Sequence, residues 1–240
     1  MKNEMPYLLA IDCSGRIGSA AAARGPHLLA EKVFSGRMRH SSELFPAMET
    51  LLEETGGNLE NVSAFCFTRG PGSFTGLRIA VSTAKMLGFA RKIPVISANT
   101  LDTIAVNAAE YIEKYSEDIE HLAVILDAKQ NHFFSAVYKC QAGNWTKHIG
   151  DALISSEGLL EKLRELERPA VVGEGLLYHA DLFRSAGIRI LPESYWPARA
   201  RGVLKIAYQK YLSSDFEDIF SLVPYYIREP EITEKSGRQR

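Results

Sequence analysis

The stretch FTRGPGSFTGLRIAVSTAKMLG, residues Phe67–Gly88, is the most informative segment of this chain. A short apolar run, residues 62–67, leads into it and is typical of a strand that is covered on both faces. Gly70 and Gly72 then form a turn around a proline, and a serine or threonine can cap the helix that follows. The segment therefore predicts a buried strand, a glycine turn and a helix in direct succession.

The glycine turn has two interpretations. Gly70, Gly72 and Gly76 lie between a strand and a helix, where backbone N–H groups at a helix N-terminus can bind a phosphate. Their spacing matches neither the dinucleotide fingerprint nor the P-loop, because the third glycine is displaced and no Lys-Ser/Thr pair follows. The alternative is that the glycines only give the backbone the freedom to turn. The residues alone favour this structural role, and Gly70 and Gly72 remain candidate phosphate-binding residues.

The predicted helix, residues 74–90, carries a stripe of residues with almost no side chain. Small residues recur every four positions, at Gly76, Ala80, Ala84 and Gly88. Another backbone can approach such a row closely, either inside the domain or from another chain. Periodicity cannot separate these two alternatives. Apolar residues flank the stripe: Leu77, Val81, Met86 and Leu87.

The chain as a whole alternates strands and helices in two successive units. Each unit starts with strands and continues into alternating strands and helices, with a boundary near Asn99–Thr100. Residues 1–99 and 100–223 are thus expected to form two related lobes of a mixed α/β protein. Residues 224–240 form a tail, whose last residues, 234–240, are expected to be disordered.

Composition restricts the classes of function. The 240 residues are 46% hydrophobic and 24% charged, with a net charge of -1, so no global field draws the protein onto nucleic acid. Three cysteines without a CxxC pair favour buried thiols in a reducing cytosol. The N-terminus lacks the layout of a secretory signal, and no window approaches the roughly 20 apolar residues of a membrane span. We expect a cytoplasmic protein without a membrane segment.

Candidate catalytic residues are few. The chain has no G-x-S-x-G elbow, and its six histidines form no H-x-x-x-H pair, so neither a catalytic triad nor a metal site is expected. Asp12 ends the first strand and faces a turn with Ser14, where it could orient magnesium and phosphates. Asp127 is its counterpart in the second unit. The alternative is that Asp12 caps the backbone of its own turn.

Several segments of the sequence resemble those of a known protein family. RGPGSFTGLRIA, residues 69–80, is similar to the signature of the bacterial TsaB family, also called YeaZ. The resemblance extends from near the N-terminus to the tail and is weak between about 140 and 220. Five further segments match in order: LLAIDCSGRIGSAA (8–21), HSSELFPAMETLL (40–52), SANTLDTIA (97–105), LDAKQNHFFSAVY (126–138) and PYYIREPE (224–231).

The resemblance implies a two-lobed, actin-like and Hsp70-like ATPase (ASKHA) fold that is degenerate as an enzyme. It also implies the dimerisation subunit of the machinery that makes N6-threonylcarbamoyladenosine at position 37 of tRNA. TsaD, which carries paired metal-binding histidines absent here, performs the transfer. The chain would be its non-catalytic scaffold, with TsaE joining the pair and tRNA bound through the complex. No intrinsic cofactor or metal is implied, since the partners use ATP and magnesium, and a homodimer would form when TsaD is absent.

The resemblance places the TsaD interface on two helices of the first lobe, residues 40–54 and 74–90. The expected interface residues are His40, Leu44, Phe45, Met48, Leu51, Phe74, Gly76, Leu77, Ala80, Val81, Ala84 and Gly88. The alternative function is an ATP-dependent phosphotransferase that holds its nucleotide between the lobes. Its candidate cofactor-binding residues are Asp12, Ser14, Gly70 and Gly72, with Asp127 as the second acid. Cys13 and Gly15 depart from the family pattern and weaken this alternative.

Overall fold

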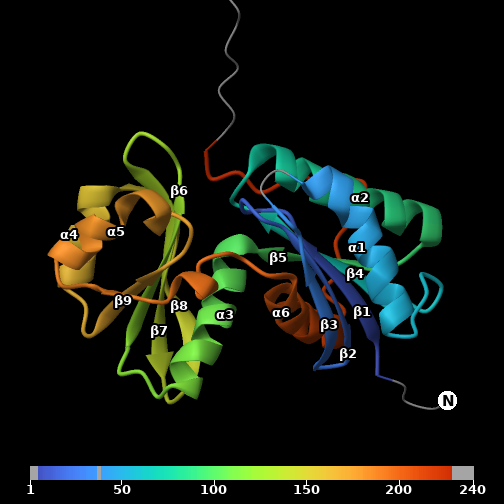
Figure 1. Cartoon of the computed structure of the whole chain (residues 1–240), viewed down its shortest axis with the longest axis horizontal. Coiled ribbons are helices and arrows are strands. Elements are labelled where there is room, and N and C mark those ends of the chain that lie inside the picture. The colour runs from blue at the N-terminus through green and yellow to red at the C-terminus, as the bar shows by residue number, and fades with distance from the viewer. Residues whose placement is uncertain (1–4, 37–38, 229–240) are drawn as a thin grey trace, which may run out of the picture.

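The first lobe is an α/β domain built on a five-stranded sheet (Figure 1). The computed structural model describes residues 5–36 and 39–228. The elements of this lobe are β1 (Tyr7–Asp12), β2 (Ser19–Arg24), β3 (His27–Val33), α1 (His40–Glu54), β4 (Ala64–Gly70), α2 (Phe74–Arg91) and β5 (Val95–Asn99). The strands lie in the order β3-β2-β1-β4-β5, in which β1, β2 and β3 are antiparallel neighbours and β1, β4 and β5 are parallel neighbours.

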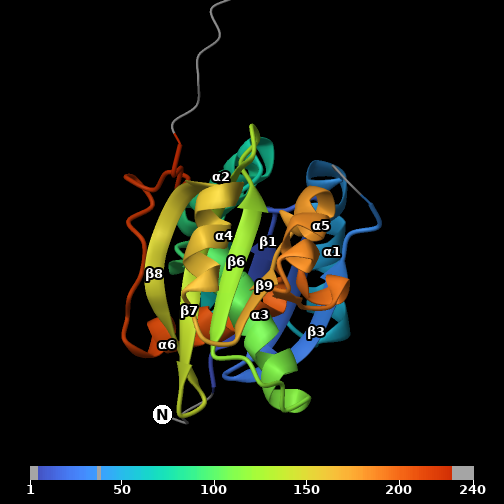
Figure 2. The same ribbon diagram turned by 90° about the vertical axis from the view of Figure 1, so that its left-hand side faces the viewer.

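The second lobe repeats this plan. Its elements are α3 (Thr100–Lys114), β6 (His121–Asp127), β7 (His132–Gln141), β8 (Asn144–Ser155), α4 (Ser156–Arg164), β9 (Pro169–Val172), α5 (Leu176–Ser185), β10 (Arg189–Ile190) and the 3-10 turn η1 (Glu193–Tyr195). The strand order β8-β7-β6-β9-β10 matches that of the first sheet, strand for strand. The directions match as well, because β6 pairs antiparallel with β7 and parallel with β9. In Figure 2, α4 and α5 lie in front of this sheet and α3 lies behind it.

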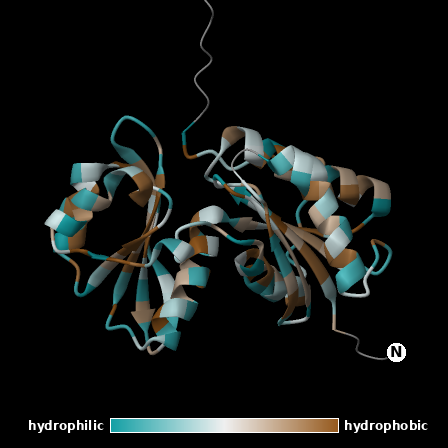
Figure 3. Ribbon diagram, viewed as in Figure 1, coloured by the Kyte–Doolittle hydropathy of each residue, from teal (hydrophilic) through white to brown (hydrophobic). Residues whose placement is uncertain are grey.

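The central strand of the first sheet, β1, is buried on both faces, and its residues 8–11 are all apolar. Leu9 and Ile11 of β1 face α1 and α2, whereas Leu8 and Ala10 face the opposite side. Alternate residues of a strand point to opposite faces, so both sets need a covering layer. Figure 3 shows hydrophobic residues running along the strands between the helices.

The layer on the second face of this sheet comes from the far end of the chain. Helix α6 (Ala200–Leu212) packs on β1 through Ala200, Val203, Leu204 and Ala207, the spacing of one helical face. The first lobe therefore includes a helix from the range 100–223 that was expected in the second lobe. The sequence did not reveal this return because an apolar helical face does not show which sheet it covers.

Residues 215–228, here called the C-terminal strap, run back over the first lobe. The N–H group of Glu217 donates to the carbonyl of Val95 (2.8 Å), and that of Tyr225 donates to the carbonyl of Arg69 (2.9 Å). At its end, Arg228 reaches the second lobe and donates to the carbonyl of Ala128 (3.3 Å). The strap thus contacts both lobes. The predicted disorder of residues 234–240 lies outside the described residues.

Candidate functional site

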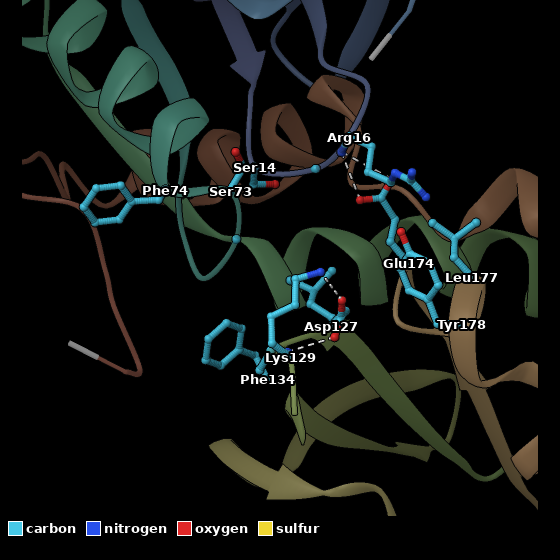
Figure 4. A pocket seen from close by; sticks show the side chains of 14 residues that line it. Ser14, Arg16, Ser73, Phe74, Asp127, Lys129, Phe134, Glu174, Leu177 and Tyr178 are labelled. Atoms are coloured by element: carbon cyan, nitrogen blue, oxygen red, sulfur yellow. Dashed lines mark hydrogen bonds and ion pairs between the residues drawn. The ribbon is translucent and has the colours of Figure 1, made fainter. Parts of the chain in front are cut away.

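A pocket of about 540 Å³ lies between the two lobes (Figure 4). The first lobe contributes Ser14, Gly15, Arg16, Gly72, Ser73 and Phe74, and the second contributes Leu126, Asp127, Ala128, Lys129, Phe134, Glu174, Leu177 and Tyr178. Most of its lining is apolar. The polar side chains come from the turns after β1 and β6, the turn before α2, the loop before α5 and α5 itself. This is where the sequence placed a candidate nucleotide cleft.

Asp12 lies behind this pocket rather than in its lining. Its side chain is fully buried, and Oδ1 accepts hydrogen bonds from the Ser14 N–H (3.1 Å), the Ser14 hydroxyl (2.6 Å) and the Thr68 hydroxyl (2.7 Å). The other oxygen, Oδ2, has no hydrogen-bond partner within the described part of the chain. The contacts of Oδ1 are those of an aspartate that fixes its own turn. Ser14, by contrast, lines the pocket as expected.

Asp127 occupies the matching position in the second lobe. Each acid is the last residue of the first strand of its sheet, β1 or β6, as the sequence indicated. The Lys129 ammonium lies 2.7 Å from Asp127 Oδ2, and the Lys129 N–H donates to Oδ1 (2.9 Å). Burial opposes ionisation of Asp127, but these hydrogen bonds outweigh it and hold its pKa below the ordinary value. The carboxylate is therefore paired inside the pocket.

The glycine turn before α2 serves close packing. A side chain on Gly72 would collide with the carbonyl of Ser14, and one on Gly70 would collide with the carbonyl of Tyr225 in the strap. Gly70 is absent from the pocket lining, whereas Gly72 belongs to it. At the start of α2, the Ser73 N–H donates to the Ser14 carbonyl (2.7 Å). Both glycines thus allow a close approach of neighbouring backbone, and of the two only Gly72 lines the pocket.

The expected interface stripe on α2 is buried inside the chain, which corrects the prediction that it forms a partner surface. Gly76, Ala80, Ala84 and Gly88 face the chain's own sheet and strap, with Ala80 and Ala84 fully buried. A side chain on Gly76 would collide with the carbonyl of Cys13. The small residues let α2 lie close to its own sheet, so the stripe belongs to the core.

The same correction applies to most of the other expected interface residues. His40, Leu44, Met48 and Leu51 on α1, and Leu77 and Val81 on α2, are also buried. The His40 ring reaches inward, where Nε2 lies 3.2 Å from the Gly15 carbonyl oxygen. Apolar periodicity identified the helical face that packs on the sheet, and this face is unavailable to a partner.

The outer faces of α1 and α2 form an apolar groove of about 470 Å³. The helix groove, as we call it, is lined by Phe45, Phe74, Thr75, Arg78, Ile79, Ser82, Thr83 and Met86. Phe45 is 45% exposed, Phe74 39% and Met86 46%. Phe45 and Phe74 are thus the members of the expected interface set with large exposed apolar side chains. Met86 was noted in the sequence as flanking the stripe, and the structure adds it to the surface.

The two lobes have sheets with the same strand order, a pocket lies between them, and a helix from the end of the chain returns to the first sheet. This arrangement is that of the actin-like ATPase fold. The predicted fold class is therefore confirmed. Among the described residues, no helix combines the length and the apolar character that crossing a bilayer requires.

Comparison with known proteins places the chain more closely. Residues 27–187 match the family model described as TsaD, tRNA N6-adenosine threonylcarbamoyltransferase. The tRNA threonylcarbamoyladenosine biosynthesis protein TsaB of Bacillus subtilis is 26% identical over 95% of this chain and 96% of its own length. Its namesake from Haemophilus influenzae is 27% identical over 97% of this chain and 98% of its own length.

A solved structure gives the same result. The crystal structure of a Pseudomonas aeruginosa protein described as similar to peptidase YEAZ has a TM-score of 0.76 and 27% identity, covering 93% of this chain and 100% of its own. The chain belongs to the family of the TsaD model and, within it, to the TsaB (YeaZ) proteins.

Proposed function

We propose that this chain is a non-catalytic cytoplasmic subunit in the formation of N6-threonylcarbamoyladenosine in tRNA, and that it binds a TsaD-type transferase through the helix groove. The names of its relatives support the role in tRNA modification. The observation that carries the proposal for the surface is the groove itself, which exposes three large apolar side chains between α1 and α2. Contiguous exposed apolar surface of this kind marks interaction sites in otherwise soluble folds.

The chemistry of the groove fits a protein helix. The Arg78 guanidinium lies 3.7 Å from the centre of the Phe74 ring and covers one of its faces. Ile79 and Met86 continue the apolar surface along the same side of α2. An apolar floor with one cation at its rim suits an amphipathic helix with an acidic edge. We propose that such a helix belongs to TsaD, that TsaE and tRNA join through the pair, and that a second copy of the chain takes this place when TsaD is missing.

The pairing of charges inside the interlobe pocket supports a subunit that leaves the chemistry to its partners. Asp127 is paired with Lys129, and Glu174 accepts a hydrogen bond from the Arg16 N–H (3.0 Å). These carboxylates are bound within the chain instead of facing a substrate. We propose accordingly that ATP and magnesium are used by the partners.

Binding of purified TsaD from the same organism tests the proposal. Replacing Met86 by Asp places a charge in the groove and should weaken TsaD binding about thirtyfold, or about 2 kcal/mol. Leu212→Asp is the matched control, because Leu212 is an exposed apolar residue at the end of α6, outside the groove. Calorimetry with both variants checks this. Equal affinity of Met86→Asp and the wild type would place the interface elsewhere.

The interlobe pocket supports one rival, an ATP-dependent phosphotransferase. A volume of about 540 Å³ next to Ser14 and Asp127 has room for a nucleotide. Calorimetry of the full chain with Mg-ATP separates the two functions. Micromolar binding that is lost in Asp127→Asn would favour the enzyme, whereas the proposed scaffold predicts no such heat.

A further inference from the structure

A groove of about 670 Å³ runs along α3, between the β7–β8 hairpin and α6. In Figure 1, α3 lies between the second sheet and α6. This α3 groove shares no lining residue with the interlobe pocket or the helix groove. The residues that α3 contributes are spaced for one face of the helix: Asp102, Ala105, Val106, Ala109, Glu110 and Glu113. The groove therefore follows the helix for most of its length.

The middle of the α3 groove is apolar. Ala105, Val106 and Ala109 line it from α3, and their short side chains leave the space open. Trp145 of the hairpin and Ile206 of α6 add apolar surface from the two sides. Trp145 is half-buried and packs against the core of the second lobe, which holds its indole ring in place. The face of such a ring attracts a cation.

The end of the α3 groove at the start of the helix already holds an ammonium group. The Lys147 Nζ atom lies 2.7 Å from Asp102 Oδ1 and 2.6 Å from Asp151 Oδ1. The Tyr138 hydroxyl donates to the same oxygen of Asp102 (2.6 Å). One lysine is thus shared by two carboxylates, which leaves this end with a net charge of -1. The lysine side chain also shows that this end accommodates a primary ammonium group.

The other end of the α3 groove, at the last turns of the helix, carries the same net charge. Lys205 forms an ion pair with Glu110. Glu113, one helical turn further along, is exposed and has no ion-pair partner among residues 5–36 and 39–228. Two carboxylates and one ammonium group again leave a net charge of -1. The two ends are about 12 to 16 Å apart along the helix axis, since Asp102 precedes Glu110 by eight residues and Glu113 by eleven.

A linear organic dication fits this distribution of charge and apolar surface. An alkyl polyamine carries ammonium groups that are joined by methylene chains. Its terminal ammonium groups would face the two negative ends, and its methylene groups would cover the apolar middle, where their removal from water is favourable. An anion of the same length would meet an excess of negative charge at both ends.

We propose that the α3 groove is a binding site for a linear polyamine. One terminal ammonium group lies against Glu113 and Trp145. The other reaches Asp102 and Asp151 and shares the two carboxylates with Lys147. The bound polyamine contacts α3, the β7–β8 hairpin and α6 together, so it links the second sheet to a helix that packs on the first.

Calorimetric titration of the full chain with spermidine at low ionic strength tests this inference, and one bound molecule per chain is expected. Glu113→Gln removes the unpaired charge and should weaken binding about threefold. Trp145→Leu keeps an apolar side chain but removes the aromatic face, and should weaken binding about fivefold. Glu157→Gln is the matched control, because this exposed acid of α4 lies outside the groove and its loss removes the same charge. It should bind spermidine like the wild type.

Butylamine, which has one ammonium group, separates a site with two charged ends from a site for a single cation. It should bind about tenfold more weakly than spermidine, because it uses only one end of the groove. Equal affinity for the two amines would overturn the proposal.

Equal spermidine affinity of Glu113→Gln and Glu157→Gln would also overturn it, because the attraction would then come from the net charge of the chain alone. If trilysine binds and spermidine does not, the groove takes a basic peptide segment and the proposal is wrong. If Trp145→Leu fails to fold, the comparison of Glu113→Gln with Glu157→Gln decides, since both side chains are exposed.

Discussion

Phe74 stacks on Tyr226, with the ring centroids 5.3 Å apart and the ring planes 28° from parallel. Phe74 is the first residue of α2, and Tyr226 lies in the C-terminal strap. The same Phe74 ring lines both the interlobe pocket and the helix groove. A single side chain thus connects the strap, the pocket and the surface that we propose for TsaD.

Removal of Tyr226 should therefore affect the groove from a distance. Tyr226→Ala deletes one face of the stack, and we expect a loss of about 1 kcal/mol in the free energy of unfolding, together with weaker TsaD binding. Denaturant unfolding and calorimetry measure the two effects. Phe220→Ala is the control, because Phe220 is an aromatic residue of the same strap that is 78% exposed. Equal TsaD affinity in both variants would show that the strap does not support the groove.

The small-residue stripe gives a sharper prediction about the core. Ala84→Arg should destabilise the fold by at least about 3 kcal/mol, because the new charge has no partner in the interior. Ala90→Arg places the same side chain on an exposed position of the same helix and should leave stability within about 0.5 kcal/mol of the wild type. Chemical denaturation of the pair checks the assignment. A stable, monomeric Ala84→Arg protein would mean that the stripe is open to partners after all.

The small-residue stripe on α2 shows how much of the packing could be predicted from the sequence. The 74–90 helix was predicted almost to the residue, since a capping serine and apolar periodicity are local signals. Periodicity also identified a face that needs close packing. It could not say whether the partner of that face was a sheet or another chain, because both favour small residues.

The contacts of the interlobe pocket could be predicted from the sequence only in part. Asp12 and Asp127 were predicted as equivalent strand-end acids, and the two sheets place them so. Glu174 was not among the residues predicted for this pocket. Its partner is a backbone N–H group 158 residues away in the sequence, and such a contact leaves no pattern in residue types. A charged residue between two glycines after a strand was the one signal that could have pointed to it.

The pH dependence of stability should report the burial of Glu174. Its pKa in the folded chain lies above the ordinary value of 4.5, chiefly because burial disfavours the charged form. The folded state therefore binds this proton more tightly than the unfolded state does. Stability from this group is complete below the ordinary pKa and is lost as the pH rises through the raised value, at up to about 1.4 kcal/mol per pH unit.

Glu174→Gln isolates this contribution. The amide keeps the size of the side chain and an acceptor for the Arg16 N–H, but it does not titrate. As the pH rises from 4.5, the free energy of unfolding of the wild type should fall relative to that of Glu174→Gln. A difference that stays constant with pH would mean that Glu174 is as hydrated in the folded chain as in the unfolded one.

Variants of Asp12 distinguish a structural from a catalytic role for the acid at the end of β1. Its Oδ1 accepts three hydrogen bonds, from the Ser14 N–H and the hydroxyl groups of Ser14 and Thr68. Asp12→Ala leaves these donors without an acceptor in a buried place, where each unsatisfied group costs about 1 to 3 kcal/mol. Asp12→Asn keeps the accepting oxygen and should lose much less stability, although its amide could not serve as the ionised acid that a magnesium site requires. If the Asn variant is stable and binds TsaD like the wild type, Asp12 acts through the turn that it fixes. Loss of function in a stable Asn variant would instead give the carboxylate charge a direct role.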